Sequence, residues 1–186
     1  MKVTVISPLF PPDLAPTASY TKILLAELTS QNLNVSSIIY GQSPETVANV
    51  NFITIPKRYQ VHLRLWSMAR AIYKQRRTTN IFILCNGPST EVPFWFVNLF
   101  FKQPYIFIVN DQTAVARTMD SKWRSTIYRN LKNNAQANID IKNDISSYCS
   151  PKIHPLLPYP EAAIKNFKIT WDKHLIEILK QMYVRK

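Results

Sequence analysis

Short, continuously apolar runs alternate along this chain with longer segments of helical periodicity. Three of the runs are rich in β-branched and aromatic residues: Lys2–Ser7 (KVTVIS), Ile81–Cys85 (IFILC) and Tyr105–Val109 (YIFIV). Residues 35–40 and 52–55 have the same character. Runs of this kind are typical of strands buried on both faces, as the strands of a parallel sheet are. The alternation therefore predicts an α/β protein.

The segments between these runs carry apolar stripes at helical spacing. The first helix is predicted to start at Thr17 and to end before Asn32, a residue type that tolerates the left-handed conformation at helix ends. Its stripe consists of Thr21, Leu24, Leu25 and Leu28. Further helices are predicted at residues 61–77 and 91–101 and around Trp123, Ile127 and Leu131. Because strands joined by helices pair in parallel with right-handed crossovers, we expect a Rossmann-like doubly wound sheet covered on both faces.

The chain is long enough for one domain with its own core. It has 186 residues, of which 46% are hydrophobic. We expect residues 1–150 to form the α/β domain. Residues 151–168 begin with a proline-rich stretch and are predicted to be a linker. Residues 169–186 are predicted to form an amphipathic helix that packs back onto the domain. Its apolar stripe consists of Trp171, Leu175, Ile178 and Met182.

The formal net charge is +12 at pH 7, an excess that attracts nucleic acid or the anionic face of a membrane. The basic residues gather around the second predicted helix, which carries Arg70, Lys74, Arg76 and Arg77. Lys57, Arg58 and Arg64 precede them, Tyr59, Trp66 and Tyr73 are interleaved, and a further group comprises Lys122, Arg124, Arg129 and Lys132. Three interpretations stay open: a solvated face with the aromatic residues in the core, attachment to a membrane surface and, as the minority interpretation, nucleic-acid binding.

Composition argues against several classes of site. The chain has 2 glycines, where average usage gives about 13, so a glycine-rich phosphate loop is not predicted. Cys85 and Cys149 lie far apart and the histidines are dispersed, so we predict no metal site, no disulfide and no cofactor. The N-terminus lacks the pattern of a signal peptide, and the apolar residues 92–101 are too few to cross a bilayer. We expect a cytoplasmic protein, either free or peripheral at the inner face of the membrane.

The connector after the first strand is rich in proline and leads directly into the first helix. Its notable residues are Pro11, Pro12, Asp13, Ala15, Pro16 and Tyr20. Residues 104–111 (PYIFIVND) form a predicted strand that ends in an Asn-Asp pair. This pattern resembles the N-terminal domain of the family-4 glycosyltransferases, which belong to the GT-B group of two Rossmann domains. Residues 135–148, the proline-rich stretch and the last predicted helix are similar to the family's next strand and helix, its interdomain linker and its C-terminal crossing helix.

Ligands of open α/β sheets bind beyond the carboxyl ends of the strands, where the connectors of this chain should gather. Asp111 is the strongest candidate for a catalytic carboxylate; alternatively, it is a turn-forming residue. The residues after the strand at 81–85 are polar and can pair with sugar hydroxyls. Alternatively, Ser89 or Thr90 caps the following helix, with Glu91 in its first turn. The candidate acceptor-binding residues are Pro12, Asp13, Ala15, Thr17, Tyr20, Asn86, Gly87, Ser89, Glu91 and Asn110.

The chain departs from the family's pattern at three points. Ala15 and Pro16 stand where the family usually has glycines that approach the donor phosphates, and Asn110 stands where it has a histidine. The family's second domain, which carries the nucleotide-sugar site, has no counterpart among these residues. The resemblance therefore implies the acceptor-binding half of a sugar transferase in cell-surface or lipid-linked glycan synthesis, dependent on a donor domain from a partner. A non-catalytic binding or scaffold module at the membrane surface is the alternative, and a nucleic-acid binder is less favoured.

Overall fold

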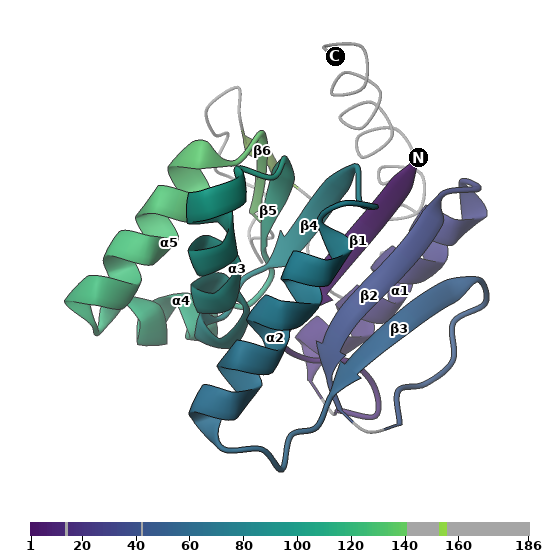
Figure 1. Cartoon of the computed structure of the whole chain (residues 1–186), viewed down its shortest axis with the longest axis horizontal. Helices are drawn as coiled ribbons and strands as arrows, with labels where there is room; N and C mark the ends of the chain where they lie inside the picture. The colour runs from purple at the N-terminus through teal and green to yellow at the C-terminus, as the bar shows by residue number, and fades with distance from the viewer. Residues whose placement is uncertain (14, 42, 141–152, 156–186) are drawn as a thin grey trace.

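The computed structural model describes residues 1–13, 15–41, 43–140 and 153–155 of the chain (Figure 1). Their strands form one parallel sheet of seven, in the order β3-β2-β1-β4-β5-β6-β7. The strands are β1 (Lys2–Ser7), β2 (Asn34–Tyr40), β3 (Val50–Ile55), β4 (Ile81–Cys85), β5 (Tyr105–Val109), β6 (Ala137–Asp140) and β7 (Ile153–Pro155). The order reverses after β3, where the chain returns to place β4 beside β1. The predicted Rossmann-like, doubly wound sheet is confirmed.

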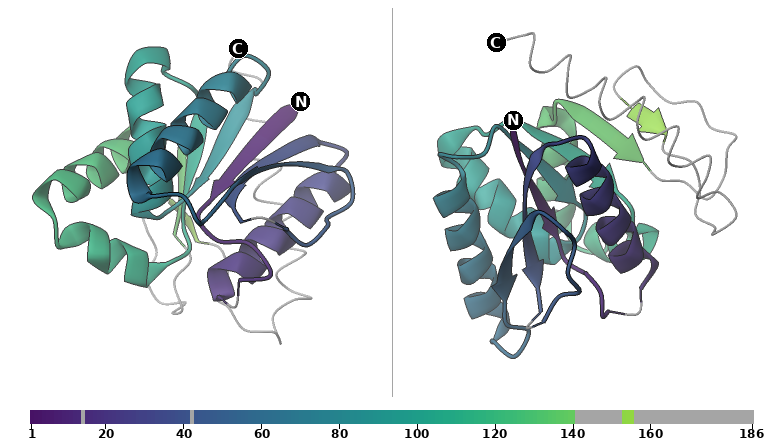
Figure 2. Two further views of the ribbon diagram at one scale, coloured as in Figure 1. Left: turned by 60° about the horizontal axis from the view of Figure 1, so that its bottom comes forward. Right: turned by 90° about the vertical axis from the view of Figure 1, so that its right-hand side faces the viewer.

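Helices cover both faces of this sheet. They are α1 (Pro16–Ser30), α2 (Val61–Gln75), α3 (Pro88–Phe101), α4 (Gln112–Met119) and α5 (Lys122–Asn134). Figure 2 shows α1 on one face, with α2 and α3 on the other. The alternating side chains of each strand feed two separate cores: Val3 and Val5 of β1 pack in the cluster with Leu24, whereas Ile6 packs in the cluster with Phe94. Helices α2, α3 and α5 all contribute buried residues to the second cluster.

Several elements lie where the sequence predicts them. The observed bounds of β1, β4 and β5 are the predicted ones, because β4 and β5 are uninterrupted apolar runs with a clear polar or proline boundary and β1 is a β-branched run that ends at Pro8. Asn32, just after α1, has a φ of +56°, as its place at the predicted helix end requires. Helix α3 begins three residues earlier than predicted, and α4 is not in the prediction at all. Helix α4 is short, and it starts because Asp111 caps it.

The remaining predictions concern the C-terminal part of the chain. Ile153–Pro155, at the start of the segment predicted as a linker, forms β7 and pairs with β6. The rest of that segment, and the predicted helix at residues 169–186, lie outside the described residues. The packing of that helix onto the domain stays a prediction.

The aromatic residues of the basic segment do not lie in the core. Tyr59 and Tyr73 are 40% and 43% exposed, and Trp66 is 63% exposed. The part of the solvated-face interpretation that places these aromatic rings in the core is therefore wrong, whereas a solvated basic face stays a prediction. Trp123 is also misplaced by the prediction: Ile127 and Leu131 of the same stripe are buried, but Trp123 is 54% exposed. Trp123 lies in the first turn of α5, one turn before the part of the helix that meets the sheet-side core.

Candidate functional site

The candidate site lies at the carboxyl-terminal edge of the sheet, the lower edge in Figure 1. Strands β1, β4 and β5 are neighbours in the sheet and run in the same direction, so the connectors that follow them meet there. Gly87, in the connector of β4, lies close to Pro8, in the connector of β1. Its φ is +147°, a conformation that favours glycine, and a Cβ on it would lie 3.2 Å from Cγ of Pro8. A larger residue at position 87 would therefore push the connectors of β1 and β4 apart.

Asn86 joins the connectors of β4 and β5. Its side chain is fully buried. Oδ1 accepts hydrogen bonds from the backbone N–H groups of Asn110 (2.9 Å) and Asp111 (3.0 Å), and Nδ2 donates to the carbonyl oxygen of Asp111 (2.7 Å). One amide thus pairs three backbone groups of the neighbouring connector. Asn86 is predicted to bind the acceptor. In the structure it fixes the backbone of Asn110 and of the catalytic candidate Asp111.

Asp111 occupies the N-cap of α4. Its Oδ1 accepts a hydrogen bond from the N–H of Ala114 at 3.0 Å, which confirms the alternative interpretation of a turn and capping residue. The residue is partly exposed, so its carboxylate also faces the edge where ligands of such sheets bind. A catalytic role for Asp111 stays a prediction.

Two of the predicted acceptor-binding residues have buried polar atoms without a hydrogen-bond partner among the described residues. They are Asn110, at both side-chain atoms, and Thr17, at its hydroxyl. Comparable atoms lie elsewhere, on Ser36, Ser37, Thr118 and Asn138. Thr17 and Asn110 differ from those residues in their position: Asn110 follows β5 directly, and Thr17 lies in the first turn of α1, at the end of the connector that follows β1. Burying a polar group without a partner costs about 1–3 kcal/mol, and such groups often mark a ligand site.

Asp13 is held by a residue that the sequence places in the basic segment. Its Oδ1 forms an ion pair with Lys57, and its Oδ2 accepts a hydrogen bond from the N–H of Phe10 at 3.3 Å. Lys57 follows β3 directly, so it starts at the same edge of the sheet as the connector of β1. The predicted site did not include Lys57. Its position shortly after a parallel strand could have indicated that it lies at this edge.

The other predicted residues are arranged in two layers. Pro12 is exposed, and Ala15 and Ser89 are partly exposed, so they are accessible from the edge. Tyr20 is only 2% exposed and packs in the core cluster behind the connector. The carbonyl oxygen of Ser89 accepts a hydrogen bond from the Tyr40 hydroxyl at 2.9 Å. The outer layer can therefore contact a ligand, and the inner layer supports it.

Glu91 is buried in the first turn of α3, with 2% exposure. Its Oε1 accepts a hydrogen bond from the N–H of Gly87 at 2.8 Å. The Thr90 hydroxyl donates to backbone carbonyl oxygens instead of accepting from an N–H, and Ser89 forms no cap. The alternative of a Ser89 or Thr90 cap is therefore wrong, whereas the placement of Glu91 in the first turn is confirmed. Burial raises the pKa of Glu91 to about 7, and the Gly87 hydrogen bond opposes that rise.

Glu91→Gln is expected to stabilise the protein above neutral pH. With its pKa raised to about 7 from the usual 4.5, the folded state holds a proton that the unfolded state has released, so wild-type stability falls as pH rises between these values. Glutamine keeps the acceptor for Gly87 and never ionises. The variant should exceed wild type by roughly 2–3 kcal/mol at pH 8 and match it at pH 4. Urea unfolding at both pH values measures this, and a difference that does not change with pH would contradict it.

The described part of the chain offers little for a metal or a reactive thiol. No three side chains among its histidines, cysteines, aspartates and glutamates come together as metal ligands would. Cys85 is a free thiol in the core of β4, and burial raises its pKa to about 12. A thiol in that environment is unreactive at neutral pH. The described groups at this edge are carboxylates, amides, hydroxyls and the Lys57 amine.

Solved structures resemble this fold, although no protein-family model and no curated protein sequence matches the chain. Anabaena Alr3699/HepE, crystallised in complex with UDP and glucose, matches with a TM-score of 0.56 and 9% identity over 92% of this chain and 50% of that one. UDP-GlcNAc 2-epimerase from Methanocaldococcus jannaschii matches with a TM-score of 0.48 and 11% identity over 76% of this chain and 40% of that one. The C-terminal domain of the coenzyme A biosynthesis bifunctional protein CoaBC matches with a TM-score of 0.48 and 8% identity, over 75% of this chain and 76% of that one.

The match to HepE supports the class of fold. The chain has a Rossmann-like α/β fold that it shares with HepE. It spans about half the length of HepE. None of the described helices is both long enough and apolar enough to cross a bilayer.

Proposed function

We propose that this chain is the acceptor-binding half of a GT-B sugar transferase that acts in cell-surface or lipid-linked glycan synthesis. The observation that carries the proposal is the side-chain amide of Asn110, together with the hydroxyl of Thr17, at the carboxyl edge of the sheet: both are buried and have no hydrogen-bond partner among the described residues. Sugar hydroxyls both donate and accept hydrogen bonds, so they suit an amide and a hydroxyl equally. The fold shared with HepE, whose structure holds UDP and glucose, supports the same class of ligand.

The carboxylate of Asp111 is a group at this edge that could accept a proton from an acceptor hydroxyl. Asn86 fixes the backbone of Asp111 from both sides, and the Ala114 N–H orients its Oδ1. Asn110 hydrogen-bonds but does not transfer protons near neutral pH, so it serves in orientation. In this proposal Asp111 acts as general base, and Asn110 and Thr17 position the acceptor.

The donor nucleotide would bind elsewhere. The chain has 2 glycines, and neither Ala15 nor Pro16 gives the bare backbone that a sugar-nucleotide pyrophosphate approaches closely. A donor domain from a partner would therefore complete the enzyme, across the carboxyl edge of this sheet.

A membrane surface is the proposed working place. Helices α2 and α5 contain no acidic residue, and the one acidic residue of α3, Glu91, is buried. The exposed charges of these helices are therefore all basic, and Arg70, Lys74 and Arg77 are exposed on or just after α2. The second candidate function, a non-catalytic module at the membrane surface, rests on these same exposed charges. It predicts vesicle binding without sugar binding.

Saturation-transfer NMR on the full chain tests the proposal. The probes are methyl glucoside, methyl galactoside and methyl N-acetylglucosaminide for the acceptor, and UDP-glucose for the donor. We expect saturation of the ring protons of at least one methyl glycoside, and no micromolar binding of UDP-glucose. Absence of signal from all three glycosides favours the non-catalytic module. Micromolar UDP-glucose binding by the chain alone would contradict the assignment as an acceptor half.

A further inference from the structure

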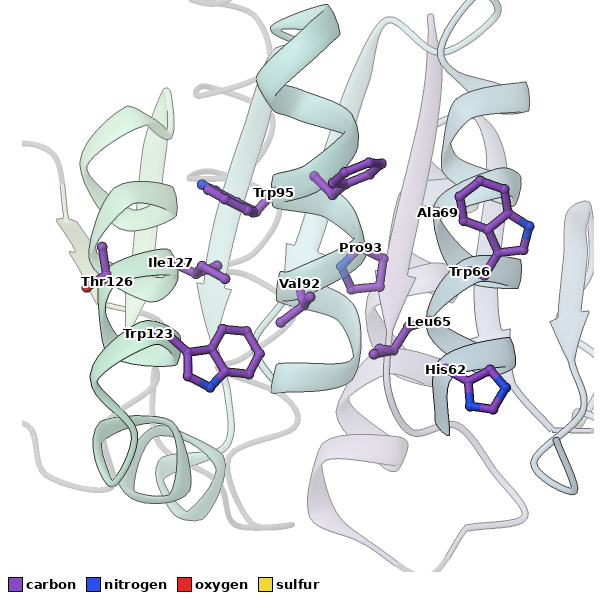
Figure 3. Close-up of a pocket in the computed structure, with 11 residues that line it drawn as sticks. His62, Leu65, Trp66, Ala69, Val92, Pro93, Trp95, Trp123, Thr126 and Ile127 are labelled. Atoms are coloured by element: carbon purple, nitrogen blue, oxygen red, sulfur yellow. The ribbon is translucent and has the colours of Figure 1, made fainter. Parts of the chain in front are cut away.

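An apolar groove of about 690 Å³ runs between α2, α3 and α5 on the outer face of the domain (Figure 3). Leu65 and Trp66 lie on its α2 side, Val92 and Trp95 on α3, and Trp123 and Ile127 on α5. Its volume lies in the range of sites for small ligands, about 300–1,000 Å³. Three of the chain's 4 tryptophans line this groove.

The groove continues into an exposed apolar surface. Trp66 and Phe96 at its rim are 63% and 47% exposed, and beyond it Leu99 and Phe100 on α3 are 51% and 67% exposed. Single exposed apolar residues are common on soluble proteins, but a contiguous group of this kind marks a contact with a ligand, a protein or a membrane.

The charged residues around the groove indicate which kind of molecule it binds. Arg70 of α2 is exposed and follows Ala69, which lines the groove, and the guanidinium of Arg124 lies 5.4 Å from the ring centre of Trp123. The only acidic residue on the three helices, Glu91, is buried. Basic side chains combined with tryptophan at the edge of an apolar surface fit an anionic headgroup with a hydrocarbon chain behind it. Nucleic acid fits less well, because the groove between the basic groups is apolar.

The groove also lies close to the candidate site. Its lining residues include His62 in the first turn of α2, Val92 and Pro93 in the first half of α3 and Trp123 in the first turn of α5, and α2 and α3 follow the connectors of β3 and β4 at the carboxyl edge of the sheet. Val92 follows Glu91, whose carboxylate accepts the hydrogen bond from Gly87. The α3 wall of the groove therefore belongs to the helix whose N-cap is Gly87.

We propose that the groove binds the hydrocarbon chain of an anionic lipid, with the headgroup directed toward the carboxyl edge. The apolar lining takes the chain, and the arginines of α2 and α5 take the headgroup charge. The orientation of the headgroup rests on the proposed function, since it would bring a lipid-linked acceptor to Asp111. Binding of the chain itself does not depend on sugar transfer.

Dodecyl phosphate, used as a monomer below its micellar concentration, is the probe for this proposal. Titration calorimetry on the full chain is expected to show saturable binding, whereas inorganic phosphate and the neutral, sugar-free detergent octaethylene glycol dodecyl ether should bind at least tenfold more weakly. Tryptophan fluorescence of the Trp171→Phe variant should change on the same titration, because its three remaining tryptophans line the groove. Equal binding of phosphate or of the neutral detergent, or no binding of dodecyl phosphate, would overturn the proposal.

Two variants test whether dodecyl phosphate binds in the groove. Thr126→Trp fills the groove and Trp66→Ala removes part of its wall, so each should weaken dodecyl phosphate binding at least tenfold. Phe100→Ala is the matched control, since Phe100 is 67% exposed and lies outside the groove; it should change binding less than twofold. If Trp66→Ala converts an oligomer into a monomer, the groove is an interface between copies and the lipid proposal is wrong. The assay contains no sugar, so a negative glycoside result with positive dodecyl phosphate binding rejects the proposed function alone.

Discussion

Replacing Arg70, Lys74, Arg76 and Arg77 together by glutamate is expected to weaken binding to anionic vesicles about a thousandfold. A basic residue near an anionic membrane contributes about 1 kcal/mol, so losing four costs about 4 kcal/mol before any repulsion from the new carboxylates. The substitution of Arg76 also removes two cation–π contacts. Its guanidinium lies 3.7 Å from the ring centre of Tyr73 and 4.4 Å from that of Phe101. Co-sedimentation with phosphatidylglycerol vesicles measures the loss, and rising salt should reproduce it.

Two double variants distinguish an effect of this particular face on vesicle binding from an effect of the protein's net charge. Arg70→Glu/Lys74→Glu and Lys2→Glu/Lys22→Glu change the charge equally, but Lys22 is on α1, across the sheet, and Lys2 is on β1. The first pair should weaken binding at least tenfold more than the second. If wild type stays in solution with anionic vesicles at low salt and retards duplex DNA, nucleic-acid binding replaces membrane binding as the better account.

Asn86→Ala should destabilise the fold by about 4 kcal/mol. The substitution leaves three backbone groups of the β5 connector without their partner, and each such loss costs about 1–3 kcal/mol. Because Asn86 is fully buried, water does not readily replace the side chain. Urea unfolding measures the change in the free energy of unfolding.

Asn134→Ala is the control for this prediction. Asn134 is exposed, and its Nδ2 donates one hydrogen bond to the carbonyl oxygen of Asn130 within the same helix. Its replacement should change stability by less than about 1 kcal/mol, because solvent takes over that contact. Should Asn86→Ala cost as little as Asn134→Ala, the connectors of β4 and β5 are not held together by this side chain.

The fold was predictable because its central strands are buried on both faces. Such strands, as at Ile81–Cys85, read as unbroken apolar runs whatever packs against them. Helix α4 was missed because it is short and begins with a capping carboxylate that was interpreted as a possible catalytic group. Its start depends on one local hydrogen bond, which a pattern of apolar spacing does not reveal.

The candidate site was predictable where it depends on strand order and not where it depends on side-chain packing. Asn86, Asn110 and Asp111 follow neighbouring parallel strands, so topology alone brings them together. The Lys57–Asp13 ion pair and the burial of Glu91 depend on how the connectors turn. The groove was not predicted, because helical spacing alone does not show whether Trp66 and Trp123 enter the core. In the structure both line the groove on the outer face.

Saturation-transfer NMR on the Asn110→Leu variant tests the central claim most directly. Leucine has a similar size and removes an amide that has no partner within the described structure, so stability should stay the same or rise. If Asn110 and Thr17 bind a sugar acceptor, the methyl glycoside signal seen with wild type should fall at least tenfold in this equally stable variant. An undiminished glycoside signal in Asn110→Leu would contradict an acceptor site at the carboxyl edge of this sheet.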